Sequence, residues 1–108
     1  MINKSGLKPL GLAVLVEIYE EKRKSVIVIP ETVKERLQMI ETRAIIVEAG
    51  PEAWADEKEP RAASGDLVFI AKFAGAMITG PADGKLYRMI NDRDVYAKDL
   101  VTLEKRDD

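Results

Sequence analysis

The sequence contains neither cysteine nor histidine among its 108 residues. Without cysteine the chain can form no disulfide and no thiolate zinc site, and without histidine it has no imidazole base. We therefore expect no enzyme, no catalytic residue and no metal ligand. The missing cysteine also fits a reducing, cytoplasmic location.

The chain also lacks a strong net charge and long apolar runs. The 19 acidic and 17 basic residues give a formal charge of -2, which is not the basic excess that nucleic-acid binding requires. No apolar run approaches the roughly 20 residues that span a bilayer, and the first residues do not form a signal peptide. We expect a single soluble domain over residues 1–108 that contacts neither nucleic acid nor membrane.

Four consecutive β-branched residues form the most unusual stretch. Residues 26–29 (VIVI) lie between a charged run at 20–24 and Pro30. Because proline cannot donate to a sheet ladder, this stretch fits poorly inside a central strand. It is either an edge strand packed on the core or an apolar segment offered to a partner.

Most of the remaining chain predicts short strands. Alternating or continuous apolar residues bounded by Gly, Pro, Asn and Asp predict strands at 12–19, 43–49, 67–73, 76–79, 86–90 and in one or two pieces from 95 to 103. Residues 31–40 form either a short capped helix or a structured loop. Many short strands with regular turn signals predict an all-β barrel or sandwich.

Two features could suggest chemistry. Asp92 and Asp94 could be imagined as an acid/base pair, but aspartates in a turn commonly accept bonds from local amides. Trp54 lies among acidic residues in a segment at 51–64 that we interpret as a long exposed loop or hairpin. It has no basic groove around it and is not a base-stacking platform.

The order of motifs resembles the GroES-type co-chaperonins. The matching stretches are LKPLG at 7–11, VLVE at 14–17, IVIPET at 27–32, AGP at 49–51, GDLVFIAKFAG at 65–75 and DGKLYRMINDRDVYA at 83–97. The resemblance implies an irregular antiparallel β-barrel with a mobile loop at about 20–41 and a roof hairpin at about 50–62. A C-terminal extension of about 98–108 continues past the usual end.

The resemblance also implies a function. The chain would be a co-chaperonin that forms a sevenfold ring and caps a large GroEL-type chaperonin in a nucleotide-dependent manner, enclosing unfolded client proteins. The partner would bind the ATP, so we expect no cofactor on this chain. The implied chaperonin-binding residues are Val26, Ile27, Val28 and Ile29. The implied subunit interface comprises Leu12, Val14, Val16, Val95 and Ala97, and the implied roof hairpin includes Pro51, Glu52, Trp54 and Glu57.

The chain departs from the family pattern in several places. Ser25 and Val26 stand where two glycines are usual, so the loop should have less backbone entropy to lose on docking. Leu12-Ala13 replaces an Asp-Arg pair, Leu37 replaces a common proline, and the segment after Gln38 is about four residues longer. Such departures look like those of divergent or phage-encoded members.

Two alternatives follow from these departures and from the fold. The first is a GroES-fold structural or regulatory protein that no longer binds a chaperonin. The second is an enzyme domain, since medium-chain alcohol dehydrogenases contain a GroES-like barrel. That barrel works beside a Rossmann domain and uses Cys and His zinc sites, for which this chain has neither the length nor the residues.

Overall fold

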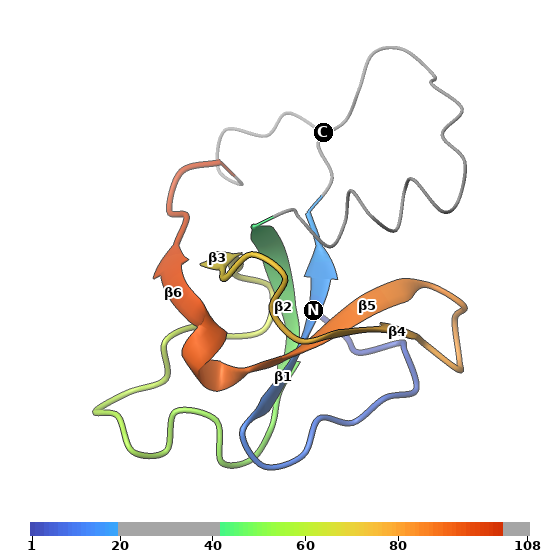
Figure 1. Ribbon diagram of the computed structural model, residues 1–108, viewed down its shortest axis with the longest axis horizontal. Helices are drawn as coiled ribbons and strands as arrows, with labels where there is room; N and C mark the ends of the chain where they lie inside the picture. Colours follow the sequence, from blue (N-terminus) through green and yellow to red (C-terminus); the bar gives the residue numbers. More distant parts are fainter. Residues whose placement is uncertain (20–41, 103–108) are drawn as a thin grey trace.

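The computed structural model describes residues 1–19 and 42–102 (Figure 1). They form six strands and one short 3-10 helix: β1 (Ala13–Ile18), β2 (Arg43–Ala49), β3 (Leu67–Ile70), β4 (Ala76–Thr79), β5 (Leu86–Asn91), η1 (Asp92–Asp94) and β6 (Val95–Lys98). The strands at 43–49 and 76–79 have the predicted bounds. The predicted helix or loop at 31–40 lies outside the described residues.

The strands make one antiparallel sheet in the order β4-β5-β1-β2-β3-β6. β5 lies next to one edge of the sheet, and β6 forms the opposite edge. Because the short η1 alone connects these two strands, the sheet curls. The backbone amide of Ala71, just after β3, donates to the carbonyl of Asp94 in η1 at 3.0 Å. The predicted irregular antiparallel β-barrel is confirmed.

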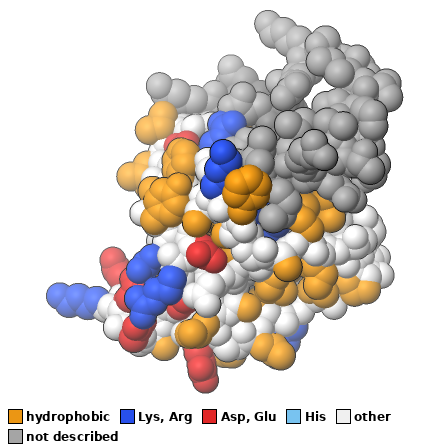
Figure 2. All heavy atoms as spheres, viewed as in Figure 1, with side chains coloured by type: hydrophobic (Ala, Val, Ile, Leu, Met, Phe, Trp, Pro, Cys, Tyr) orange, Lys and Arg blue, Asp and Glu red, His pale blue; other side chains and the backbone are white. Residues whose placement is uncertain are grey.

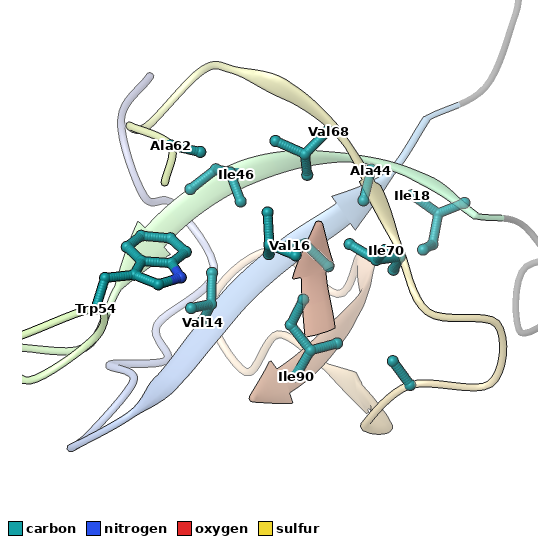
Figure 3. Close-up of a cluster of buried hydrophobic side chains, with 12 residues drawn as sticks. Val14, Val16, Ile18, Ala44, Ile46, Trp54, Ala62, Val68, Ile70 and Ile90 are labelled. Atoms are coloured by element: carbon teal, nitrogen blue, oxygen red, sulfur yellow. The ribbon is translucent and has the colours of Figure 1, made fainter. Parts of the chain in front are cut away.

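β1 lies at the centre and buries both of its faces. Val14, Val16 and Ile18 point into the main core, as their alternation predicted, while Leu15 packs with Val47 and Tyr87 on the other face. Burying one such aliphatic side chain stabilises the fold by about 1.5–3 kcal/mol. The main core cluster (Figure 3) comprises Val14, Val16, Ile18, Ala44, Ile46, Trp54, Ala62, Val68, Ile70, Ala74, Ile90 and Val95.

β3 ends three residues earlier than the predicted strand at 67–73. The chain turns after Ile70, and Phe73 adopts a left-handed φ of 63° while its side chain remains exposed. The fully buried Arg88 of β5 holds this turn, because its Nε and Nη2 atoms donate to the carbonyl oxygen of Ala74 at 3.0 and 2.6 Å. Apolar composition alone therefore overestimated the length of the strand, since the turn that ends it depends on a contact with a residue distant in sequence.

The last strand also ends early. β6 stops at Lys98, and the predicted strand at 99–103 is replaced, as far as Thr102, by a turn built on Asp99. One carboxylate oxygen of Asp99 accepts from the amides of Val101 and Thr102 at 2.9 Å, and the other accepts from the Thr102 hydroxyl at 2.6 Å. These bonds satisfy the backbone locally and so compete with continued strand pairing.

Candidate functional site

The predicted chaperonin-binding residues Val26, Ile27, Val28 and Ile29 lie outside the described residues, within 20–41. The described chain does define where this segment is attached. β1 and β2 are antiparallel neighbours, and Ile18 pairs with Ala44 at the end of both strands. The described residues that flank 20–41 therefore lie side by side, at the ends of two adjacent strands.

The attachment point is held together by several contacts. The amide of Tyr19 donates to the carbonyl of Arg43 at 3.1 Å, and the Arg43 guanidinium lies 5.1 Å from the centre of the Tyr19 ring. The amide of Ile70 donates to the carbonyl of Thr42 at 2.7 Å. Tyr19 is buried. The two residues that flank 20–41 are thus well fixed on the barrel.

The predicted subunit-interface residues divide into two groups. The side chains of Val14, Val16 and Val95 are buried in the chain's own core, while Leu12 and Ala97 are exposed. β1 is hydrogen-bonded on both sides within its own chain. β6, in contrast, is an edge strand of the sheet, with Tyr96 exposed on it. The interface remains a prediction. Of its predicted residues, Leu12 and Ala97 are the two that a neighbouring subunit could reach.

The segment predicted as a roof hairpin differs from that expectation. Residues 50–62 form a series of turns with no strand among them, although Pro51 and Glu52 are exposed and Glu57 is partly exposed as expected. Trp54, which we interpreted as part of a solvated loop, is only 2% exposed and belongs to the main core. This residue anchors the segment, because exposing an indole ring to water costs far more free energy than exposing the charged side chains around it.

Asp92 fixes Trp54 from the other end of the chain. The backbone amide of Trp54 donates to the Asp92 carboxylate at 2.8 Å, and its indole Nε1 donates to the Asp92 carbonyl oxygen at 2.9 Å. Trp54 has a left-handed φ of 57°, which costs a non-glycine residue about 1–2 kcal/mol. Burial and two hydrogen bonds offset that strain. From the sequence we expected Asp92 to accept hydrogen bonds from nearby backbone amides. That interpretation missed its main partner, Trp54.

The rest of the segment is held by charges. Arg61 pairs with Glu57 at 2.9 Å and donates from Nη1 to the carbonyl of Val95 in β6 at 2.6 Å. The hydrogen bond that the Arg61 guanidinium donates to the Glu57 carboxylate raises the pKa of Arg61. Arg93 of η1 pairs with Asp56. The lone tryptophan inside a charged stretch was the one sequence signal that an anchor lies here.

Within the described residues, the structure offers no alternative site with obvious chemistry. Histidine and cysteine are absent from the sequence, and the described acidic residues form no cluster of three that could hold a metal ion. Residues 1–19 and 42–102 contain no helix long and apolar enough to cross a membrane.

In a comparison with known protein families, residues 6–98 match the family described as "Chaperonin 10 Kd subunit". Three similar relatives are each named co-chaperonin GroES. The chain is 39% identical over 95 residues to the protein from Caldicellulosiruptor saccharolyticus, 37% over 94 to that from Geobacillus stearothermophilus and 34% over 97 to that from an Exiguobacterium species. Each comparison covers 84% of this chain and 94 to 96% of the relative.

Proposed function

Because this chain belongs to the family of the 10 kd chaperonin subunit and is a co-chaperonin, we propose that it acts as a ring-shaped lid on a large chaperonin. The observation that carries this proposal is the attachment of residues 20–41 to the barrel at Tyr19 and Thr42. In the sequence, the apolar stretch Val26–Ile29 lies between these two attachment residues, as a docking segment would.

The docking energy of one such segment is modest. Burying Ile27, Val28 and Ile29 yields roughly 5–9 kcal/mol before costs, at about 1.5–3 kcal/mol per side chain. Ordering the backbone around them costs on the order of 1–2 kcal/mol per residue. A single segment therefore binds weakly, whereas several segments on one ring convert later contacts into intramolecular ones and raise the overall affinity steeply.

The partner we propose is a GroEL-type chaperonin ring, and the lid is a heptamer that encloses unfolded clients in the cytoplasm. Weak individual contacts suit a lid that must also be released. A nucleotide-driven movement of the partner that withdraws its sites would dissociate all segments together. In this proposal the chaperonin binds the ATP, and this chain uses no cofactor and catalyses no reaction.

The alternative, a barrel that no longer binds a chaperonin, is not favoured, because the curated relatives compared above are all named co-chaperonins. The deciding experiment is refolding of a client that requires both chaperonin and lid, with ATP, in the presence and absence of this protein. We expect folded client only when the protein is present, and a heptameric mass for the protein alone. A ring that neither binds the chaperonin nor promotes refolding would overturn the proposal in favour of the alternative.

A further inference from the structure

Residues 1–7 lie against their own barrel before the chain enters β1. The carbonyl oxygen of Ser5 accepts from the backbone amide of Ala82, in the turn between β4 and β5, at 2.9 Å. A Cβ atom on Gly6 would lie only 2.9 Å from the Cβ atom of Ala82, so the two backbones pass very close to one another. Figure 1 shows this part of the trace running beside the β4–β5 hairpin. The first residues are therefore fixed to a turn that is distant in the sequence.

The same segment is also attached on the β2 side of the sheet. The Nδ2 atom of Asn3 donates to a carboxylate oxygen of Glu48 in β2 at 2.9 Å. The Ser64 hydroxyl lies 3.1 Å from the carbonyl oxygen of Met1 and 2.8 Å from that of Val47. Because β5 and β1 lie between β4 and β2 in the sheet, the two attachments place the segment across both of these strands.

Asn3 and Ser5 hold the segment in one conformation. The Oδ1 atom of Asn3 accepts from the amide of Ser5 at 3.1 Å and from its hydroxyl at 2.6 Å. The Nδ2 atom of Asn3 also donates to the carbonyl of Leu7 at 2.7 Å, and the amide of Leu7 donates to the Ser5 hydroxyl oxygen at 2.9 Å. Ser5 is fully buried within this network. The network fixes Leu7 where it packs against the second core cluster, which consists of Leu15, Val47 and Tyr87.

The attachment of the segment is mostly polar. The side chains of Met1 and Ile2 are 57% and 78% exposed, and Leu7 is the hydrophobic residue of the segment that packs on the second cluster. Because water competes for the same polar groups, each hydrogen bond adds little net stability. A segment with few buried apolar contacts opens at a lower free-energy cost than the fold as a whole.

The surface beneath and beside the segment is apolar. Ile78 of β4 and Met89 of β5 are partly buried and pack on the second cluster together with Leu7. In the view of Figure 2, charged side chains gather mainly away from the β4–β5 hairpin, and hydrophobic side chains lie on the hairpin side. Removal of the segment would therefore enlarge an apolar surface on this side of the sheet.

From these contacts we propose that residues 1–7 form a conformational strap, which opens and closes over the second core cluster independently of the barrel. Asn3 and Ser5 are its positioning residues. When the strap is closed, Leu7 covers the cluster; when it is open, the cluster is exposed and the β4–β5 turn loses its contact with Ser5. Residues 1–5 precede the part of the chain that matches the family. The strap belongs to one subunit and depends neither on the proposed ring nor on chaperonin binding.

Hydrogen exchange of the full-length protein tests whether the strap opens on its own. The amide of Leu7 is bonded to the Ser5 side chain and the amide of Ala82 to the Ser5 carbonyl, so opening releases both at once. We expect similar protection factors at these two amides, at least about tenfold lower than those of the β1 amides. Equal protection of both amides and of β1 would show that the strap opens only when the barrel unfolds, and would overturn the proposal.

Replacement of Asn3 tests whether the contacts form one unit. In Asn3→Ala, protection at Leu7 and Ala82 should fall in parallel by a further factor of about ten, while β1 keeps its protection. Lys4→Ala is the matched control, because Lys4 is exposed between Asn3 and Ser5, and it should behave as the parent. A fall at Leu7 alone would show that the two attachments are separate. A fall that includes β1 would show that Asn3 supports the whole barrel, and either result would overturn the proposal.

Discussion

The carboxylate of Asp92 lies 2.8 Å from the backbone amide of Trp54, although 38 residues of sequence separate them. Asp92 is 1% exposed, and its second carboxylate oxygen, Oδ1, has no hydrogen-bond partner within the described structure. A buried carboxylate is costly unless it is hydrogen-bonded. The contact with Trp54 is therefore what makes this buried charge tolerable, and it joins the segment 50–62 to the turn η1.

Replacement of Asp92 tests this relationship. Asp92→Ala should lower the free energy of unfolding by about 1–3 kcal/mol, because the amide of Trp54 is left buried without its acceptor. Asp92→Asn keeps an acceptor oxygen and should lose less. Denaturant unfolding followed by Trp54 fluorescence, at a fixed protein concentration because assembly adds to stability, would measure both. Equal losses for the two variants would show that the hydrogen bond to Trp54 is not the stabilising contact.

Gly75 and Gly84 provide a matched pair for backbone effects. Both have a left-handed φ, 68° and 72°. A Cβ atom at Gly75 would lie 2.0 Å from the carbonyl oxygen of Met89, whereas at Gly84 it would meet nothing within 4 Å. Gly84→Ala should therefore cost only the conformational strain, about 1–2 kcal/mol.

Gly75→Ala adds to the same strain a collision between the new Cβ atom and the backbone of Met89, so we expect a much larger loss of stability or no folded protein. Melting temperatures and soluble yield of the two variants measure the difference. Similar values for both would mean that the turn after Phe73 shifts to accommodate a side chain.

Sequence patterns located the strands well wherever local signals were sufficient. β2 (Arg43–Ala49) was predicted at its exact bounds because an apolar run ends at Gly50-Pro51. The Asp83-Gly84 turn between β4 and β5 was also predicted, and the amide of Gly80 donates to the carbonyl of Lys85 there. These features depend on residues that are close in sequence.

Long-range contacts account for what was missed. The turn at Ala71–Ala74 is held by Arg88, 14 residues away, and the position of Trp54 is held by Asp92. An arginine in the middle of an apolar strand and a tryptophan in a charged loop each look locally like surface residues. Their partners became visible only when the sheet order placed β5 and η1 beside these segments. The prediction of the chaperonin-binding residues rests on the motif IVIPET and on the resemblance to the family.

The chaperonin-binding prediction is tested by charge substitution. Ile27→Asp or Ile29→Asp places a carboxylate where an apolar contact is expected, and an unpaired charge cannot be buried cheaply. Both variants should keep the parent's ring mass and lose chaperonin binding. Suppression of chaperonin ATPase measures this. Lys34→Asp, on the same segment but outside the apolar stretch, is the control and should still suppress it. Suppression by either isoleucine variant at the parent's level would show that residues 27–29 do not dock.

Alkaline pH tests the turn between β4 and β5. The hydroxyl of Tyr87, which is 4% exposed, donates to the carboxylate of Asp83. Burial, followed by the hydrogen bond to Asp83, raises the pKa of Tyr87 to about 12, compared with about 10 for a free tyrosine. The folded chain thus holds the phenolic proton more tightly than the unfolded chain. The stability from this difference is complete below about pH 10 and is lost as the pH rises from about 10 toward about 12.

Denaturation midpoints between about pH 8 and about pH 11.5 would reveal this loss. Tyr87→Phe should be less stable than the parent near pH 8, because the bond to Asp83 is gone, but its midpoint should fall less over the alkaline range. Tyr96→Phe, which removes an exposed hydroxyl on β6, should follow the parent. If Tyr87→Phe declined as steeply as the parent, another group would control alkaline unfolding, since Tyr87 is the only titratable group by which the two chains differ.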